Sequence, residues 1–266
     1  MTDLRIALYQ SPIEWENPSI NYERYSRKLL EIKGKADIVL LPEMFTTGFS
    51  MEATRIAEPF SEQMPGAIWM RNMAMELGAA VTGSIAVSAQ GNFYNRLLWA
   101  DSDGGMQWYD KRHLFSMAGE DKAYTRGKEK LIVEVNGWKI CPLICYDLRF
   151  PVWSRNRLSE DSSVEYDVLV YVANWPVARK KAWDSLLVAR AIENQCYVAG
   201  INRCGQDGNG LEYSGGSAVL TPFGEELCSS HINEECILLA TLNAADLAQL
   251  RAKFPVLRDG DRFSIS

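Results

Sequence analysis

The sequence has 266 residues, of which 47% are hydrophobic, 11% are aromatic and 23% are charged. These proportions are ordinary for globular proteins and exclude a collagen-like, coiled-coil or largely disordered chain. With 28 Lys and Arg against 34 Asp and Glu, the formal net charge is −6, which argues against a nucleic-acid partner because phosphate binding needs a basic surface.

The first elements along the chain alternate between strand and helix. A strand is predicted over residues 4–10, followed by a helix over 21–33 whose apolar residues recur at helical spacing. Residues 36–41 form a short β-rich run, typical of a strand that is buried on both faces, and residues 61–77 form a second predicted helix that ends at Gly78. Three more strands, separated by Asn, Asp and Gly turns, are predicted over 79–87, 94–100 and 106–109.

The second half of the chain continues this pattern. The dipeptide Asn136-Gly137 between apolar runs predicts a hairpin, and Pro151 at a first turn predicts a short helix over 151–158. Glycines cluster between 205 and 216, where an ordinary surface turn is expected. The remaining strands are predicted over 131–135, 138–144, 167–173, 197–202, 216–221 and 237–242, and the remaining helices over 180–195 and 244–253.

Nothing in the sequence divides the chain. It has no linker, repeat or low-complexity segment, so we predict a single α/β domain over residues 1–266, with more strands than one sheet would hold comfortably. No apolar run approaches the roughly 20 residues that span a bilayer, and no signal peptide is visible at the N-terminus. We therefore expect a cytoplasmic protein without a membrane partner.

The cysteine and histidine content predicts neither disulfides nor a zinc site. The chain has no C-x-x-C pair and only two histidines, His113 and His231. A disulfide framework is not expected in a chain of this size, so the thiols are predicted to be reduced and mostly buried. The six cysteines are Cys141, Cys145, Cys196, Cys204, Cys228 and Cys236.

Three polar residues each follow a predicted apolar strand: Glu43, Lys111 and Cys145. The sequence has no G-x-S-x-G elbow, Walker A loop or G-x-G-x-x-G fingerprint that would indicate another familiar site. Because sites in α/β proteins are built at the carboxyl ends of strands, these three side chains are candidates to meet in one site. Taken singly, each has a structural explanation: a cap or surface acid for Glu43, a solvated amine for Lys111 and a core thiol for Cys145.

A carboxylate, an ammonium and a thiol together suit acyl transfer. A free thiol has a pKa of roughly 8.5, so Glu43 is the candidate base that removes the proton of Cys145. Lys111 would offset the charge of a buried Glu43 and donate to the oxyanion that forms when the thiol attacks a carbonyl. The backbone N–H of Tyr146 is the candidate second oxyanion donor, because the residue after a nucleophile at a sharp turn commonly supplies one.

Four separated segments resemble the nitrilase superfamily of carbon–nitrogen hydrolases, most closely its ω-amidase-like branch. The segment LLPEMFTTGF (40–49) resembles the glutamate motif of that family, YDKRHLF (109–115) its lysine motif, and CYDLRFP (145–151) its cysteine motif. The segment ARAIEN (189–194) resembles the helix that follows. The resemblance runs from about residue 3 to residue 255, and three catalytic motifs in this order are far more specific than any one of them.

The resemblance implies a four-layer α-β-β-α sandwich that forms a homodimer through a helical face, giving an αββα–αββα assembly. It implies a Glu43–Lys111–Cys145 triad that needs neither a metal nor an organic cofactor. A second glutamate is also expected shortly after the lysine. Glu120 fits this position best, although the adjacent Asp121 is an alternative.

The implied substrate is a small amide that carries a carboxylate. Arg149 in the cysteine motif is the candidate partner of that carboxylate, since guanidinium groups bind carboxylates in bidentate fashion, and Phe45, Tyr146 and Trp175 are candidate pocket walls. An ion pair between Arg149 and Asp147, and core packing for Trp175, are the structural alternatives. Substrates of this kind are ω-amides of short 2-oxo dicarboxylic acids, such as 2-oxoglutaramate, or the related amide of methionine salvage.

Two other functions fit the same sequence. Another branch of the superfamily would share the triad, as in an N-carbamoyl amino acid hydrolase, an aliphatic amidase or a nitrilase. A non-catalytic interaction protein on the same fold would be favoured by loss of a triad residue, and all three are present.

Overall fold

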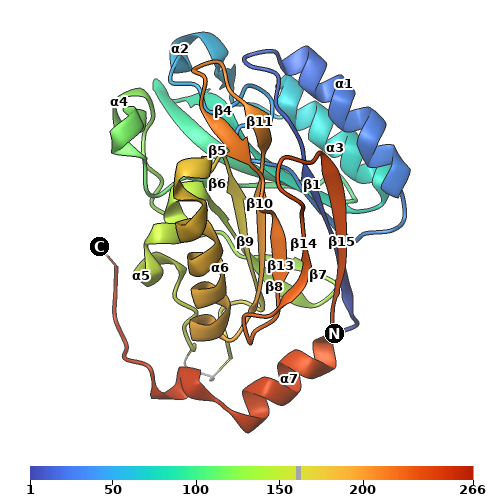
Figure 1. Cartoon of the computed structure of the whole chain (residues 1–266), viewed down its shortest axis with the longest axis vertical. Helices are drawn as coiled ribbons and strands as arrows, with labels where there is room; N and C mark the ends of the chain where they lie inside the picture. Colours follow the sequence, from blue (N-terminus) through green and yellow to red (C-terminus); the bar gives the residue numbers. More distant parts are fainter. Residues whose placement is uncertain (160–162, 266) are drawn as a thin grey trace.

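Most strands belong to two sheets in the computed structural model, which describes residues 1–159 and 163–265 (Figure 1). Within this part of the chain, the seven-stranded sheet has the order β15 (Cys236–Leu242), β1 (Leu4–Gln10), β2 (Ile38–Leu40), β4 (Ala80–Ala89), β5 (Asn92–Ala100), β6 (Met106–Asp110), and β3 (Glu58–Pro59) also pairs with β4. The six-stranded sheet has the order β14 (Glu226–Ser229), β13 (Ala218–Leu220), β10 (Tyr197–Asn202), β9 (Val168–Ala173), β8 (Trp138–Ile144), β7 (Val133–Val135). A separate pair consists of β11 (Cys204–Gln206) and β12 (Glu212–Ser214).

Both sheets have a parallel centre. Strand β2 pairs in parallel with β1 and β4, and β9 pairs in parallel with β8 and β10. The segments that leave the carboxyl ends of parallel strands emerge at the same edge of a sheet, where α/β proteins commonly build their sites. Glu43 follows β2, and Cys145 follows β8 directly, so both lie at such edges.

The two faces of β1 show how the sheets are covered. Side chains alternate along a strand, so Ile6 and Leu8 point into a core shared with the second sheet, whereas Ala7 and Tyr9 point into a core shared with two helices. These helices are α1 (Pro18–Leu29) and α3 (Pro65–Leu77), which lie side by side in Figure 1.

Helix α6 (Lys180–Asn194) covers the second sheet. Trp183, Leu187 and Ala191 form its buried stripe and pack against β10 and β13. Figure 1 shows α6 and the short α5 (Pro151–Ser154) on the side of the molecule opposite α1 and α3, and α7 (Ala244–Lys253) at its lower end. The order of layers is helix, sheet, sheet, helix, and the predicted α/β class is confirmed.

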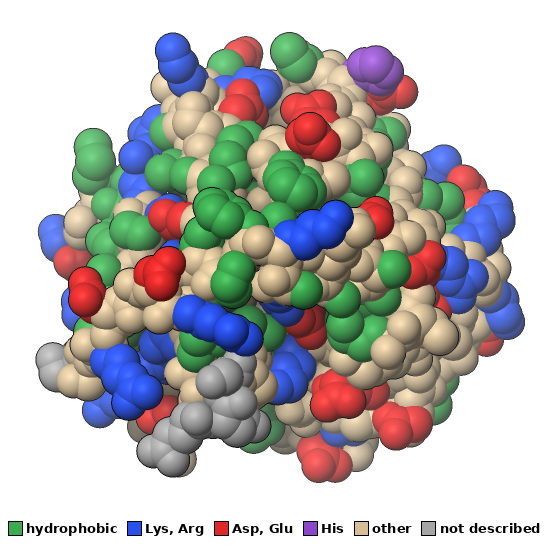
Figure 2. Space-filling view, turned by 90° about the horizontal axis from the view of Figure 1, so that it is seen from below, with side chains coloured by type: hydrophobic (Ala, Val, Ile, Leu, Met, Phe, Trp, Pro, Cys, Tyr) green, Lys and Arg blue, Asp and Glu red, His purple; other side chains and the backbone are tan. Residues whose placement is uncertain are grey.

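The surface at the lower end of the molecule carries charges of both signs. Figure 2 shows this face with Lys and Arg side chains interspersed among Asp, Glu and apolar side chains. In the part of the chain that is described, no helix combines the length and the apolar character needed to cross a membrane.

Several predicted boundaries shift for local reasons. Helix α1 begins at Pro18 rather than at residue 21, because the Asn17 side chain accepts the N–H of Ile20 and caps the helix. The prediction of a helix over 151–158 is wrong beyond Ser154. Arg155 is extended there, and Asn156 bonds to Asn194 and Tyr166 instead of continuing the helix.

Short elements were not expected from the sequence. They include α2 (Ala53–Ile56), α4 (Glu120–Ala123) and strands β3, β11, β12 and β14, together with the 3₁₀ turns η1 (Leu30–Ile32), η2 (Ser116–Ala118), η3 (Cys145–Arg149), η4 (Val177–Arg179) and η5 (Val256–Asp259). The glycine cluster is more than an ordinary surface turn. It forms the β11–β12 hairpin, whose loop is held by Asp207 through the N–H groups of Asn209 and Leu211.

Candidate active site

Cys145 occupies a sharp turn between β8 and η3. Its φ of 42° lies in the left-handed region, which non-glycine residues adopt at a cost and which marks nucleophiles at strand-to-helix turns. The buried Asp147 holds this turn by accepting the N–H of Ile144 at 3.1 Å. The same carboxylate accepts the N–H of His113 at 2.9 Å and the hydroxyl of Tyr109 at 2.7 Å, so it fixes the cysteine turn against the segment that carries Lys111.

Glu43 lies in the chain reversal that follows β2, where Met44 has a φ of 44°. Its side chain is 0% exposed. Oε1 accepts from Lys111 Nζ at 2.8 Å and from Asn95 Nδ2 at 2.8 Å, and Oε2 accepts the backbone N–H of Asn174 at 2.8 Å. Three donors therefore orient one carboxylate inside the protein.

Glu120 completes the buried cluster. Lys111 Nζ lies 2.9 Å from each of its carboxylate oxygens, and Asn95 Nδ2 lies 3.1 Å from Oε1. The backbone N–H of Phe115 donates to Oε2 at 2.6 Å. Asp121, the alternative second acid, is exposed, so the geometry places Glu120 rather than Asp121 beside Lys111.

Burial and the neighbouring charges together set the protonation states of Lys111 and Glu120. Burial alone would lower the pKa of Lys111, but Glu120, Glu43 and Cys145 outweigh it and raise that pKa above the ordinary lysine value. Burial raises the pKa of Glu120, and Glu43 adds to the effect although Lys111 opposes it. Lys111 is therefore an ammonium group at neutral pH, held between the side chains of Glu43 and Glu120.

The pKa of the Cys145 thiol is affected by the same charged side chains. Its Sγ donates to the carbonyl oxygen of Asn174 at 3.8 Å. Burial, and secondarily the Glu43 carboxylate, raise the pKa of the thiol well above its ordinary value, whereas Lys111 opposes the shift. The resting sulfur is accordingly a neutral thiol, and a base is needed to ionise it as it reacts.

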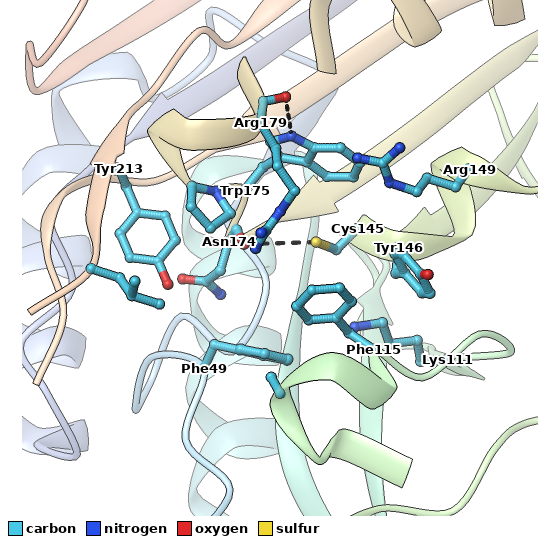
Figure 3. A pocket seen from close by; sticks show the side chains of 13 residues that line it. Phe49, Lys111, Phe115, Cys145, Tyr146, Arg149, Asn174, Trp175, Arg179 and Tyr213 are labelled. Carbon is cyan, nitrogen blue, oxygen red and sulfur yellow. Dashed lines mark hydrogen bonds between the residues drawn. The ribbon is translucent and has the colours of Figure 1, made fainter. Parts of the chain in front are cut away.

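A small cavity opens above the sulfur, as Figure 3 shows. Its volume is about 60 Å³. Most of its wall is apolar or aromatic. The lining residues are Phe49, Lys111, Phe115, Ala118, Cys145, Tyr146, Arg149, Asn174, Trp175, Pro176, Arg179, Leu211 and Tyr213.

Three of the predicted substrate-binding residues line this cavity: Tyr146, Arg149 and Trp175. The Arg149 guanidinium carbon lies 5.0 Å from the ring centroid of Trp175, and Trp175 Nε1 donates to the carbonyl oxygen of Arg179 at 2.8 Å. Among the described residues Arg149 makes no ion pair with Asp147, whose oxygens are occupied by Tyr109, His113 and Ile144.

Phe45 does not line the cavity, so the prediction for this residue needs correction. It is fully buried on the far side of the first sheet, where its ring packs against Tyr25 at a centroid distance of 5.3 Å and against Trp69 at 5.5 Å. The chain reverses between Met44 and Gly48, both of which have positive φ, and brings Phe49 to the cavity instead. The Phe49 ring lies 5.0 Å from Lys111 Nζ.

Several site residues were not predicted. Asn95 lies inside β5, and its Oδ1 accepts from Ser84 Oγ at 2.8 Å while its amide nitrogen bridges the two glutamates. Asn174 follows β9, where a polar residue after an apolar strand was an available signal. Phe115, Arg179 and Leu211 reach the cavity from a 3₁₀ turn and loops, and Tyr213 reaches it from the short strand β12, in each case without such a signal.

In the described residues, no group of three or more His, Cys, Asp or Glu side chains is arranged to hold a metal ion. The expectation that the reaction needs no cofactor stays a prediction.

Comparison with known proteins gives consistent matches along the chain. A family model described as carbon–nitrogen hydrolase matches residues 5–252. The ω-amidase YafV of Escherichia coli strain K12 is 44% identical over 265 residues, which cover 100% of both chains. A 2-oxoglutaramate amidase of Bacillus subtilis strain 168 is 34% identical over 257 residues, which cover 96% of both chains.

Solved structures show the same similarity. XC1258 from Xanthomonas campestris, a CN-hydrolase superfamily protein with an arsenic adduct in its active site, is 46% identical with a TM-score of 0.97 over 100% of both chains. A mutant of the amidase from Nesterenkonia sp. AN1, in which acrylamide has undergone Michael addition at the active-site cysteine, is 25% identical with a TM-score of 0.79. That match covers 95% of this chain and 98% of the other.

Proposed function

Because this chain belongs to the carbon–nitrogen hydrolase family, we propose that it cleaves the terminal amide of a small carboxylate-bearing substrate through a thioester on Cys145. That it is a hydrolase of non-peptide amide bonds follows from the family and from its ω-amidase relatives. The observation that carries the proposed mechanism is the buried contact of Glu43 with Lys111, beside the Cys145 thiol at the base of a small pocket.

In the first half of the reaction the amide becomes a thioester. Glu43 accepts the thiol proton while the sulfur of Cys145 attacks the amide carbonyl carbon, and Lys111 Nζ and the Tyr146 N–H bind the resulting oxyanion. Protonated Glu43 then gives its proton to the amide nitrogen. The C–N bond breaks and ammonia leaves.

The second half releases the acid. Glu43 removes a proton from a water molecule, whose oxygen attacks the thioester carbonyl carbon, and the same two donors bind the second oxyanion. The C–S bond breaks, and the proton held by Glu43 returns to the sulfur. Atoms and charges balance over the cycle, because one water is consumed for each amide cleaved.

Glu120 supports this cycle through Lys111. Its two oxygens hold the ammonium group from one side while Glu43 approaches from another, which fixes the direction of the donor toward the oxyanion. The nucleophilicity of the cysteine is supported by the Nesterenkonia amidase, whose active-site cysteine adds to acrylamide.

The substrate we propose is an ω-amide of a short 2-oxo dicarboxylic acid, such as 2-oxoglutaramate or 2-oxosuccinamate, or the 2-oxo amide of methionine salvage. Arg149 and Trp175 would bind its far carboxylate and its carbon chain. The similarity to an ω-amidase and to a 2-oxoglutaramate amidase supports this choice.

We also propose a single domain, a homodimer and a cytoplasmic location. Apolar Val152 on α5 and Ile192 on α6 are about half exposed, which suits contact with a second copy through this helical face. Light scattering coupled to size exclusion tests the dimer, and cell fractionation tests the location.

Steady-state kinetics test the proposed function. We expect kcat/KM for 2-oxoglutaramate to exceed that for glutamine, asparagine, an aliphatic nitrile and an N-carbamoyl amino acid. Cys145→Ala should lower kcat by at least about 10³-fold with an unchanged circular dichroism spectrum. Retained turnover in a folded Cys145→Ala protein would refute the thioester. A preference for the nitrile or for the N-carbamoyl amino acid would place the protein in another branch of the superfamily.

A further inference from the structure

Two arginine side chains enter the pocket, and only Arg149 has a role so far. Arg179, in η4, places its guanidinium carbon 4.9 Å from the ring centroid of Phe115, just as Arg149 lies over Trp175. In Figure 3 the Arg179 side chain points toward Cys145 and Phe115, whereas Arg149 extends along the ring of Trp175.

The donors of both guanidinium groups are left open by the protein. Within the described residues, neither group has a carboxylate partner or a hydrogen-bond acceptor. Two other arginines that are buried or half-buried do have acceptors. Arg190 donates to Glu193 and to the Leu148 carbonyl, and Arg251 donates to Asp167. An aromatic face attracts a guanidinium without using its N–H donors, which stay available in the ring plane.

The nearby acids do not neutralise the pair. Glu43 and Glu120 are bonded to Lys111 and Asn95 at the base of the pocket. Two like charges that share a small apolar pocket repel each other, and this repulsion is relieved by a ligand with acceptor oxygens. The pocket is therefore complementary to an anion that offers acceptors to both arginines.

We propose that Arg179 is the residue that makes this pocket select amides of 2-oxo acids over amides of amino acids. A 2-oxo acid presents a carbonyl oxygen next to its carboxylate, so Arg149 binds the carboxylate and Arg179 donates to the 2-oxo oxygen. Glutamine carries an α-ammonium group at the same carbon. That group has only donors and a positive charge, so Arg179 repels it.

The order of groups along the substrate fits this assignment. The amide carbon must lie at Sγ, two methylene groups separate it from the 2-oxo carbon in 2-oxoglutaramate, and the carboxylate lies farthest away. In Figure 3 the Arg179 side chain points toward Cys145, and the Arg149 guanidinium lies against the Trp175 ring, 5.0 Å from its centroid. The inference rests on the proposed amide hydrolysis at Cys145, and it adds how the pocket distinguishes amides of 2-oxo acids from amides of amino acids.

Three variants test it. Arg179→Gln removes the charge but keeps a donor, Arg179→Lys keeps the charge, and Lys181→Gln removes an exposed charge two residues away as the matched control. The backbone oxygen of residue 179 still accepts from Trp175 in each case. The measured quantity is the ratio of kcat/KM for 2-oxoglutaramate to kcat/KM for glutamine.

We expect Arg179→Gln to lower this ratio at least about 10-fold, mainly by raising KM for 2-oxoglutaramate, with glutamine turnover unchanged or improved. Arg179→Lys should keep glutamine disfavoured, and Lys181→Gln should match the wild type. An equal loss for both substrates would overturn the inference and leave Arg179 a structural role.

A binding experiment separates this inference from the proposed function. If the wild type hydrolyses neither amide, the proposed function fails, and calorimetry with 2-oxoglutarate and glutamate still tests Arg179 without turnover. Arg179→Gln should weaken 2-oxoglutarate binding at least about 10-fold and leave glutamate binding unchanged. Equal weakening of both ligands would overturn the inference.

Discussion

Asn174 holds Glu43 at two points. Its backbone N–H donates to Glu43 Oε2 at 2.8 Å, and its Nδ2 donates to the backbone carbonyl oxygen of Glu43 at 2.6 Å. Asn174 follows β9 of the second sheet, and Glu43 follows β2 of the first. The direction of the Glu43 carboxylate is thus set across the interface between the two sheets.

Asn174→Ala should lower both stability and kcat. The variant leaves the buried Glu43 carbonyl without its donor, which costs about 1–3 kcal/mol in urea unfolding, and frees Glu43 to turn away from Cys145. Asn156→Ala is the matched control, because Asn156 is also buried and donates to the Tyr166 and Asn194 carbonyls away from the pocket. It should lose comparable stability and keep its kcat. Equal kcat in the two variants would contradict a positioning role for Asn174.

Lys111→Met should leave two buried carboxylates facing each other without a cation. We expect a loss of about 3–5 kcal/mol of unfolding free energy at neutral pH, together with loss of amidase activity. Burial raises the pKa of Glu120, and without Lys111 this shift is no longer opposed, so the fold favours the protonated form of Glu120 and the loss of stability grows as pH rises through the raised value. Lys33→Met, which removes an exposed pair with Glu76, should cost about 0–1 kcal/mol. A deficit for Lys111→Met that is independent of pH would argue against this account.

The titration of Cys145 depends on Glu43. Because burial and the Glu43 carboxylate favour the neutral thiol, this group contributes stability below the ordinary thiol pKa of about 8.5 and loses it as pH rises through the raised value. Glu43→Gln removes the repulsion, so alkylation of Cys145 by iodoacetamide should reach its midpoint at lower pH than in the wild type. Mass spectrometry of the Cys145 peptide measures this, with the partly buried Cys236 as internal reference. A midpoint that is unchanged or higher would show that Glu43 does not repel the thiolate.

Phe45 and Phe49 should separate stability from substrate binding. Phe45→Ala removes a fully buried ring from the aromatic cluster with Tyr25 and Trp69 and should cost about 3–5 kcal/mol, with KM unchanged. Phe49→Ala removes a pocket wall and should raise KM about 10-fold with a small effect on unfolding. Urea titration and steady-state kinetics measure both effects. A raised KM in Phe45→Ala, together with a large loss of stability and an unchanged KM in Phe49→Ala, would show that Phe45 and not Phe49 lines the pocket.

The sequence predicts those site residues that follow strands. Glu43, Lys111 and Cys145 each stand after an apolar run. Glu43 follows the parallel strand β2 and Cys145 the parallel strand β8 of the other sheet, whereas Lys111 follows β6, which pairs antiparallel with β5. The packing of the two sheets against each other brings the three together. Glu120 was expected only from the resemblance to a family, because a glutamate in a short loop carries no local signal. The structure places it in contact with Lys111.

The residues that were missed reach the site by packing of distant segments. Asn95 lies inside β5, where its local pattern does not differ from that of an ordinary strand residue, and only the pairing of β5 with β4 brings it near Ser84. The error at Phe45 has a related origin. Phe45 stands in the glutamate motif two residues after Glu43, but positive φ at Met44 and Gly48 sets the direction of this loop and turns the Phe45 ring away from the pocket.

The β11–β12 hairpin contributes Leu211 and Tyr213 to the pocket without belonging to either large sheet. Glu43, Lys111 and Cys145 therefore lie on segments that follow strands of the two large sheets, whereas part of the pocket rim belongs to a separate hairpin. A new hairpin grafted between residues 204 and 214 would therefore reshape this part of the rim and leave the sheets, Arg149 and Arg179 in place.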